Sequence, residues 1–213
     1  MSTLDEREVV FPDVSSADEH GIVAWGKDLD VAHLHAAYSQ GIFPWPCDDD
    51  YIPWFCPDPR AVLDFDNLHI SRSLRRQLKQ CDFEFRINTA FAEVITACSK
   101  APRKEQDGTW IEPRMIQTYT EFHDLGFAVS FETWSDNKLV GGMYGVIIDG
   151  HFSGESMFHK QTNASKFALI NAVMCMQKMG LTWMDIQQLT PLLESFGAHE
   201  ISRLEFIKRI NES

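Results

Sequence analysis

Long apolar stretches are missing from this sequence of 213 residues. It contains no run of about 18 apolar residues, so no membrane-spanning helix is expected. The first residues, Met1 to Glu8, are polar and acidic, which does not fit a secretory signal. The cytoplasm is therefore the expected location. Hydrophobic residues still make up 44% of the chain, which is enough for a substantial core.

Basic residues are also few. The chain has 19 Lys and Arg against 31 Asp and Glu, which gives a net charge of -12. A protein with this charge does not coat nucleic acid nonspecifically, because phosphates would be repelled, so any contact with RNA must be local. An acidic surface would attract a cationic partner, although it could also serve solubility alone.

Cysteine pairs and the common catalytic motifs are absent. The five cysteines form no CxxC pair, so we expect reduced thiols rather than a disulfide framework or a thiolate zinc site. His33 and His35 point to different sides of a predicted helix, and no metal site is predicted there. Without GxGxxG, GxxxxGKS/T, GxSxG or HExxH, the dinucleotide, P-loop, serine hydrolase and zincin classes lose their usual support.

Capping and turn residues predict a mixed α+β protein. The stretch 42–60 contains five prolines and is expected to be an ordered loop rather than a helix or a central strand. Strands are predicted at 128–134, 138–148, 151–158 and 182–187, with a type I′ turn at Asp149-Gly150. Helices are predicted from Asp30 to Gly41, Ser71 to Gln80, Asn88 to Ser99, Pro113 to Gly126 and Asn163 to Gly180, and after a capping box of Ser202 and Glu205.

One predicted helix carries a positive stripe. Arg72, Arg75, Arg76 and Lys79 are spaced by three and four residues, which places them on one helical face. The stripe could be a solvated helix face. On an otherwise acidic chain, it also suits the phosphate backbone of an RNA.

Three tryptophans occur in turn-like contexts where a base could stack. Trp45 stands between two prolines, and Trp54 and Trp110 lie in similar surroundings. Stacking of a base on an aromatic ring needs no particular base sequence. Core packing is the default for each of these residues.

Polar residues on two predicted strands are candidates for catalysis. Asp185 and Gln187 are two residues apart, so their side chains share one face of a strand and could orient an attacking amine. Glu155 lies within another strand, where glutamate is disfavoured and where a buried carboxylate would need a partner. Exposure at the surface is the alternative for Glu155.

Eight blocks of sequence resemble, in order, the leucyl/phenylalanyl-tRNA-protein transferases of the bacterial N-end rule pathway. They are YSQGIFPW, WFCPDPRAVL, LHISRSLRR, GTWI, LVGGMYGV, FSGESMF with NASK after it, DIQ and SFGAHEISR, and they cover most of the chain. The resemblance implies a small N-terminal domain, residues 1–60, and a GNAT-like aminoacyltransferase domain, residues 61–213, with a mixed, largely antiparallel sheet. It implies no cofactor and no metal.

The resemblance also implies roles for individual residues. By their place in the blocks, Trp45 would stack on the terminal adenosine of the tRNA, and Trp110 would lie beside it. Met143, Phe152 and Met157 match positions around the pocket for the donor side chain, where flexible methionines suit both leucine and phenylalanine. Glu155 matches an active-site glutamate, and Asp185 and Gln187 match an Asp-x-Gln pair.

The implied reaction is aminolysis of an activated ester. Leucine, phenylalanine or methionine would pass from leucyl-tRNA or phenylalanyl-tRNA to proteins with N-terminal Arg or Lys, which marks them for degradation. The enzyme would be a monomer and would not bind a membrane. Two alternatives remain open: a GNAT-like transferase acting on another acceptor, such as a cell-wall peptide, and a noncatalytic adaptor for tRNA or basic N-termini.

Overall fold

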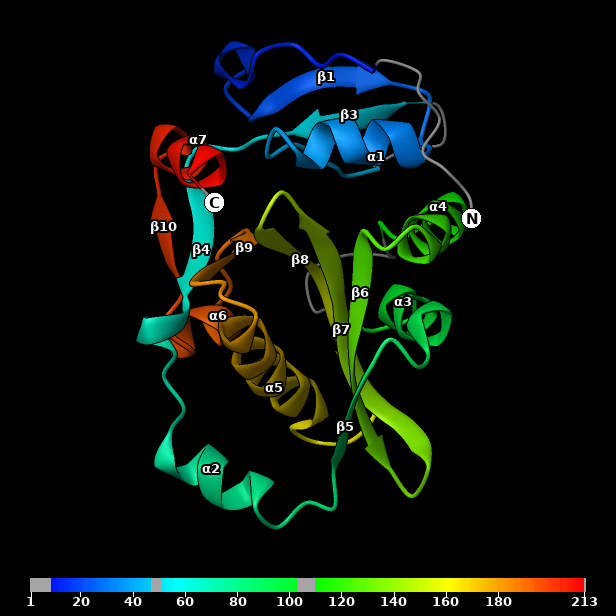
Figure 1. The fold of residues 1–213 in the computed structure, drawn as a ribbon, viewed down its shortest axis with the longest axis vertical. Helices are drawn as coiled ribbons and strands as arrows, with labels where there is room; N and C mark the ends of the chain where they lie inside the picture. Colours follow the sequence, from blue (N-terminus) through cyan, green and yellow to red (C-terminus); the bar gives the residue numbers. More distant parts are fainter. Residues whose placement is uncertain (1–8, 47–50, 103–109, 213) are drawn as a thin grey trace.

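The computed structural model describes residues 9–46, 51–102 and 110–212 (Figure 1). The acidic N-terminus, Cys47 and the first two residues of the GTWI block lie outside the described residues. Within those ranges, no helix is both long enough and apolar enough to cross a membrane.

A small antiparallel sheet forms one end of the molecule (Figure 1). Its strands are β1 (Ile22–Gly26), β3 (Ile52–Phe55) and β2 (Phe43–Pro44), in that order. Helix α1 (Val31–Tyr38) connects β1 to β2. Its start and end are as predicted, because the Asp30 side chain accepts a hydrogen bond from the backbone N–H of His33, and Gly41 has a φ of +72°.

The prediction of a loop at 42–60 is wrong in one respect. Strand β3 lies within this stretch and is the central strand of the small sheet, although it contains Pro53. Proline removes only one donor, and its carbonyl oxygen still accepts a hydrogen bond, 3.1 Å long, from the backbone N–H of Trp45. A strand this short loses little from the missing donor.

The larger sheet has seven strands, in the order β10-β4-β9-β8-β7-β6-β5. All neighbours are antiparallel except β8 and β9, which confirms the predicted mixed, largely antiparallel sheet. Asp149 and Gly150, both with positive φ, make the predicted turn between β7 and β8. The strands are β4 (Arg60–Asp64), β5 (Glu84–Ile87), β6 (Ala128–Ser135), β7 (Lys138–Ile148), β8 (His151–His159), β9 (Trp183–Gln187) and β10 (His199–Ile201).

Helices cover both faces of this sheet. The face that packs against α5 (Ala164–Lys178) also contacts α6 (Pro191–Ser195), and the opposite face packs against α3 (Phe91–Ser99), α4 (Pro113–Asp124), α7 (Arg203–Asn211) and the small N-terminal sheet. Helix α2 (Arg72–Leu78) lies at the end of the molecule away from the small sheet (Figure 1). One hydrophobic core thus runs from the small sheet into the large one. Short 3-10 turns occur at Val14–Ser16 and Phe65–Asn67.

Two predicted helix caps are wrong because tertiary contacts take over. Asn88 does not cap α3, since its side chain accepts a hydrogen bond from the backbone N–H of Ser130 on β6. Asn163 precedes α5 in a left-handed conformation, and its amide donates to Gln77 instead of capping the helix. In the last helix, Ser202 caps as predicted, but the Glu205 side chain pairs with Arg209.

A buried carboxylate on β6, and not Asn88, accepts hydrogen bonds from the backbone at the start of α3. Glu132 has no exposed surface and accepts hydrogen bonds of 2.8 Å from the backbone N–H groups of Thr89 and Ala90. Ser130 and Trp134 donate to it as well. Burial acts to raise the pKa of Glu132, but hydrogen bonds from the Thr89 hydroxyl, Trp134, the Ala90 backbone and Ser130 together outweigh burial and lower it.

We expect Glu132→Gln to lower the free energy of unfolding at neutral pH by roughly 2–4 kcal/mol, because an amide cannot accept all of these hydrogen bonds. Chemical denaturation at pH 7 measures this loss. Glu121→Gln, on the exposed side of α4, is the matched control. Because the pKa of Glu132 is lowered on folding, the difference between wild type and Glu132→Gln should shrink as the pH falls below about 4.5. Equal stability at pH 7 would contradict this role of Glu132.

Candidate active site

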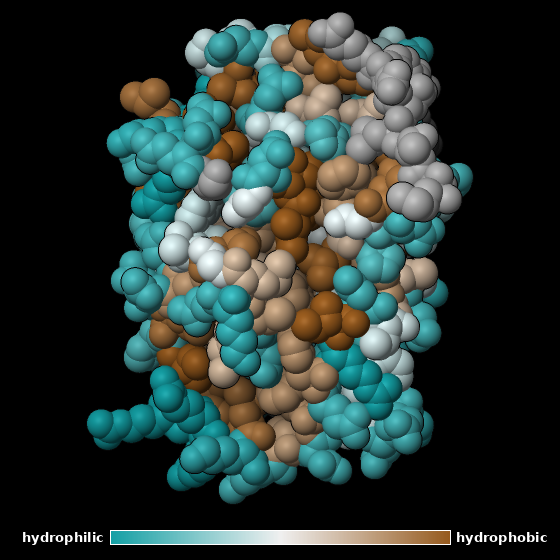
Figure 2. All heavy atoms as spheres, in the orientation of Figure 1, coloured by the Kyte–Doolittle hydropathy of each residue, from teal (hydrophilic) through white to brown (hydrophobic). Residues whose placement is uncertain are grey.

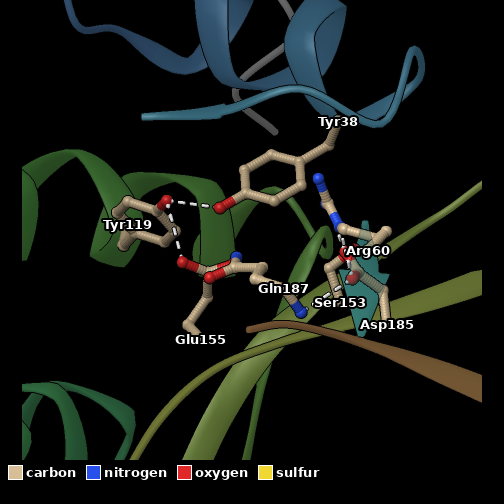
Figure 3. A network of polar contacts seen from close by, with 7 residues as sticks. All are labelled: Tyr38, Arg60, Tyr119, Ser153, Glu155, Asp185 and Gln187. Atoms are coloured by element: carbon tan, nitrogen blue, oxygen red, sulfur yellow. Dashed lines mark hydrogen bonds and ion pairs between the residues drawn. The ribbon is translucent and has the colours of Figure 1, made fainter. Parts of the chain in front are cut away.

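The parallel strands β8 and β9 diverge at the centre of the large sheet. Their ladder has a single registered pair, Ser153 and Asp185. Two residues further along each strand, Glu155 and Gln187 face each other, and the Gln187 amide Nε2 donates to Glu155 Oε1 over 2.7 Å (Figure 3). A side-chain hydrogen bond therefore connects the two strands just beyond the end of their backbone ladder.

A β-bulge directs the Glu155 side chain. On β7, Tyr144 is opposite Ser156 and Gly145 is opposite Gly154, so Glu155 is the extra residue without a partner. Gly145 allows the strands to approach here, since a Cβ at this position would overlap the Ser153 carbonyl and the Phe152 ring. The bulge thus depends on a glycine of the neighbouring strand.

The hydroxyl of Tyr119 contacts the other oxygen of Glu155, and the hydroxyl of Tyr38 contacts that of Tyr119. The Tyr119 hydroxyl on α4 is 3.4 Å from Glu155 Oε2, and it is 2.6 Å from the Tyr38 hydroxyl on α1 (Figure 3). Part of the Glu155 residue is accessible, but its carboxyl group is packed deeply among these neighbours. Burial raises the pKa of Glu155 to about 8, although the nearby Tyr38 hydroxyl and the hydrogen bond from Gln187 act to lower it.

Asp185 is held in a buried ion pair, and both of its carboxylate oxygens accept hydrogen bonds. The guanidinium of Arg60 on β4 donates to both carboxylate oxygens, at 2.8 and 2.6 Å. Ser153 donates to the same carboxylate, and so does the backbone N–H of Gln187. That last bond holds Gln187 at a φ of +62°, a conformation that a residue of its type rarely adopts.

The three predicted catalytic residues are therefore brought together, but in a different arrangement from the expected one. The side chain of Gln187 is held by Glu155, while Asp185 holds only the backbone of Gln187. Glu155 is not surface-facing, because its carboxyl group lies inside the network. The carboxyl group with the perturbed proton affinity is thus Glu155.

The two predicted stacking tryptophans are neighbours. Trp45 follows β2 and Trp110 precedes α4, and their rings stack with centroids 5.3 Å apart. Trp45 keeps partial exposure, whereas Trp110 is 6% exposed. Trp54 is 1% exposed and packs against Phe11, which confirms core packing for Trp54 and leaves it no face for a base. A large apolar ring in a central strand belongs to the core.

The three residues predicted to surround the donor side chain lie on the other side of the sheet. Met143, Phe152 and Met157 all belong to the apolar cluster that packs against α5. Phe152 and Met157 are an odd number of residues apart and share a face only because the bulge at Glu155 shifts the alternation. Gly154 lies between the two sets, near the side chains of Phe152 and Met143 and the Asp185 carbonyl.

The predicted basic stripe is exposed but distant from these residues. Arg72, Arg75, Arg76 and Lys79 are all exposed on or directly after α2. Figure 2 shows hydrophilic residues projecting from this end of the molecule, at the lower left. The structure therefore does not bring the stripe together with Glu155, and contact with one extended ligand would be needed to connect them.

Several residues of the polar network around Glu155 and Asp185 were not predicted from the sequence. Tyr38 shares a helix face with Val31 and Leu34, and a buried tyrosine usually finds a hydrogen-bond partner, which is the one sequence signal for it. Arg60, Tyr119 and Ser153 gave none, because their partners are far away in the sequence. In the described residues, no three His, Cys, Asp or Glu side chains are grouped so that they could hold a metal ion.

The fold and the site define a class of enzyme. A carboxyl group with a pKa of about 8 can exchange protons near neutral pH, and the adjacent amide can orient a polar substrate. The stacked tryptophans offer a flat aromatic surface near the small sheet. These features suit a group-transfer enzyme in which a proton moves during the reaction.

Known proteins identify the family. Residues 62–211 match the model of the leucyl/phenylalanyl-tRNA protein transferases, and residues 27–58 match the model of their N-terminal domain. A leucyl/phenylalanyl-tRNA--protein transferase of Chromobacterium violaceum is 47% identical, over 97% of this chain and 89% of the relative. One from Flavobacterium johnsoniae is 46% identical, over 94% of this chain and 95% of the relative. The chain belongs to this family, whose members are aminoacyltransferases.

Similarity to solved structures is weaker. A GCN5-related N-acetyltransferase-like protein from Streptococcus suis is 12% identical, with 80% of this chain and 63% of that chain covered, at a TM-score of 0.37. L-PGS from Bacillus licheniformis is 14% identical, with 71% and 49% covered, at a TM-score of 0.44. The strand order and the family match define the fold without these two proteins.

The raised pKa of Glu155 predicts a characteristic dependence of stability on pH. Below about pH 4.5 the carboxyl group is neutral in the folded and the unfolded protein. Between about 4.5 and 8 the unfolded chain loses this proton and the folded protein keeps it, so a rising pH lowers the contribution of Glu155 to stability.

Glu155→Gln removes this titration, so the variant should gain stability relative to wild type as the pH rises from 5 to 8. The slope should not exceed about 1.4 kcal/mol per pH unit. Urea denaturation of both proteins at pH 5, 6.5 and 8 measures the difference, and Glu121→Gln is again the control. A difference that stays constant over this range would show that Glu155 titrates normally.

Proposed function

We propose that this protein transfers leucine or phenylalanine, and also methionine, from aminoacyl-tRNA to the N-terminal Arg or Lys of acceptor proteins, in the cytoplasm and as a monomer. The relatives are named for transfer from leucyl- and phenylalanyl-tRNA to protein. The observation that carries the proposal is the pairing of Gln187 with Glu155 where β8 and β9 diverge. This pairing offers an orienting amide and an exchangeable proton at one point.

The donor would lie across this divergence. The terminal adenosine stacks on the Trp45 side of the tryptophan pair, since Trp45 is the more exposed of the two rings. The ester is held over Glu155 and Gln187, and the apolar side chain of the donor points past Gly154 towards Met143, Phe152 and Met157. A flexible methionine pair would adapt to side chains of different shape.

The acceptor amine attacks the ester carbonyl directly, and no covalent enzyme intermediate is needed. Positioning the two reactants supplies much of the acceleration. Gln187 orients the amine through its amide oxygen, which is the free end once Nε2 donates to Glu155. A neutral amide is hardly basic, and Asp185 is engaged by Arg60, so neither residue removes the proton.

The tRNA body would reach α2. This helix lies far from the small sheet, so the positive stripe would contact phosphates away from the 3′ end (Figure 1). The net charge of -12 makes such a local contact the main electrostatic attraction for RNA.

Transfer to peptides tests the proposal. With labelled leucyl-tRNA, we expect kcat/KM for a peptide beginning with Arg or Lys to exceed that for the same peptide beginning with Ala by at least tenfold, because an acidic protein favours a cationic acceptor. A ratio near one would contradict the acceptor class. Label on a cell-wall peptide instead would favour that transferase activity, and binding without transfer would favour an adaptor.

The basic stripe makes a separate prediction. Arg75→Ala combined with Arg76→Ala should weaken binding of tRNA and reduce the slope of log affinity against log salt by about one to two, because fewer counterions are released. Lys178→Ala combined with Lys208→Ala removes the same charge from exposed positions elsewhere and is the control. Equal slopes in the two double variants would place α2 outside the RNA interface.

A further inference from the structure

Two hydroxyl groups, one on α1 and one on α4, form a line that leads to Glu155. They have no part in the function proposed so far. Tyr38 on α1 is 1% exposed, and Tyr119 on α4 has no exposed surface. Their oxygens are 2.6 Å apart, and the Tyr119 hydroxyl is 3.4 Å from Glu155 Oε2 (Figure 3). A buried tyrosine needs a hydrogen-bond partner, and each of these two hydroxyls could be satisfied by the other. The row of hydrogen bonds nevertheless continues to the carboxyl group of Glu155, so it can also affect that group.

The two oxygens of Glu155 have different surroundings. Oε1 accepts the hydrogen bond of Gln187 Nε2, so it behaves as the carbonyl oxygen when the group is neutral. Oε2 faces Tyr119, and a hydroxyl can both donate and accept. Oε2 can therefore gain or lose a proton while Tyr119 and Tyr38 turn their O–H bonds to match.

The charged and titratable groups around Glu155 favour such an exchange. Asp185 raises the pKa of Glu155 and Arg60 lowers it, after the dominant effect of burial. His151, at the start of β8, has its own pKa lowered by burial and stays neutral near pH 7. Burial raises the pKa values of Tyr38 and Tyr119 well above 10, so both hydroxyls keep their protons.

The proposed aminolysis needs one proton to move. The neutral acceptor amine forms a C–N bond with the ester carbonyl and then loses a proton. As the C–O bond breaks, the ribose oxygen leaves and gains a proton. One group that takes up the first proton and returns it to the leaving oxygen balances the reaction without another reactant.

We propose that Glu155 Oε2 is the proton acceptor and donor in this transfer, and that Tyr119 and Tyr38 are positioning residues that control how readily Glu155 ionises. The inference rests on the proposed function. Ionised Glu155 accepts the amine proton, and neutral Glu155 gives it to the ribose oxygen. Tyr119 stabilises the ionised form by donating a hydrogen bond to Oε2. Tyr38, on α1, holds the Tyr119 hydroxyl in place through the hydrogen bond between the two tyrosines.

The pH dependence of kcat/KM for an Arg-peptide, measured with saturating leucyl-tRNA, tests the role of Glu155. Both the free amine, with a pKa of about 8, and Glu155 must lose a proton, so log kcat/KM should rise with a slope approaching two below about pH 7. In Glu155→Gln only the amine titrates. The rate should fall at least tenfold and the slope should drop to one.

The tyrosines are tested by Tyr119→Phe and Tyr38→Phe. Without the hydroxyl, Glu155 loses a contact that acts to lower its pKa against the effect of burial. The pH at which Glu155 ionises in the kcat/KM profile should therefore rise by about one unit. Transfer at pH 6.5 should then fall about tenfold and recover towards the wild-type rate above pH 9. Thr120→Val on the same helix removes a hydroxyl that bonds only its own helix backbone and should leave the profile unchanged.

The outcomes separate the two proposals. If wild type transfers leucine to the Arg-peptide, but the slope of Glu155→Gln equals that of wild type, Glu155 is not the proton acceptor. If the Tyr→Phe variants lose the same fraction of activity at every pH, their role is structural packing alone. If wild type does not transfer to the Arg-peptide at any pH, the proposed function itself fails.

Discussion

The ion pair between Arg60 and Asp185 connects strands β4, β8 and β9 of the large sheet with the small sheet and α7. Both side chains are almost completely buried, at 1% and 0% exposure. Separating either from water is costly, so the pair must be held in good geometry, with both carboxylate oxygens engaged. The guanidinium also lies against the rings of Phe43 and Phe206, which come from the small sheet and from α7.

The pair also determines what Asp185 can do. Its carboxylate accepts hydrogen bonds from Arg60, Ser153 and the backbone of Gln187, so it fixes the geometry of the strands around it. Glu155 has no ion-pair partner, and burial raises its pKa to about 8. Two carboxyl groups in one network thus take different roles because only one of them has a buried counter-charge.

The sheet supplies the remaining constraints. Strands β8 and β9 share one registered pair and then diverge, and the bulge at Glu155 reverses the alternation of β8 beyond it. The polar network consequently lies on the face of α1 and α4, while Met143, Phe152 and Met157 lie on the face of α5. A substrate that reaches both sets must pass where the strands part.

The sequence by itself determined the features that depend on near neighbours. The helix after Asp30, the turn at Asp149 and Gly150, and the long strands follow from caps, turn residues and alternation, whose energies are local. The motif blocks also predicted the family and placed Glu155, Asp185 and Gln187 in one site. Only the tertiary structure decided that Glu132 serves α3, that Trp54 lies in the core and that Tyr38 and Tyr119 meet Glu155. Those outcomes depend on burial and on contacts between residues far apart in the chain, and no local pattern records either.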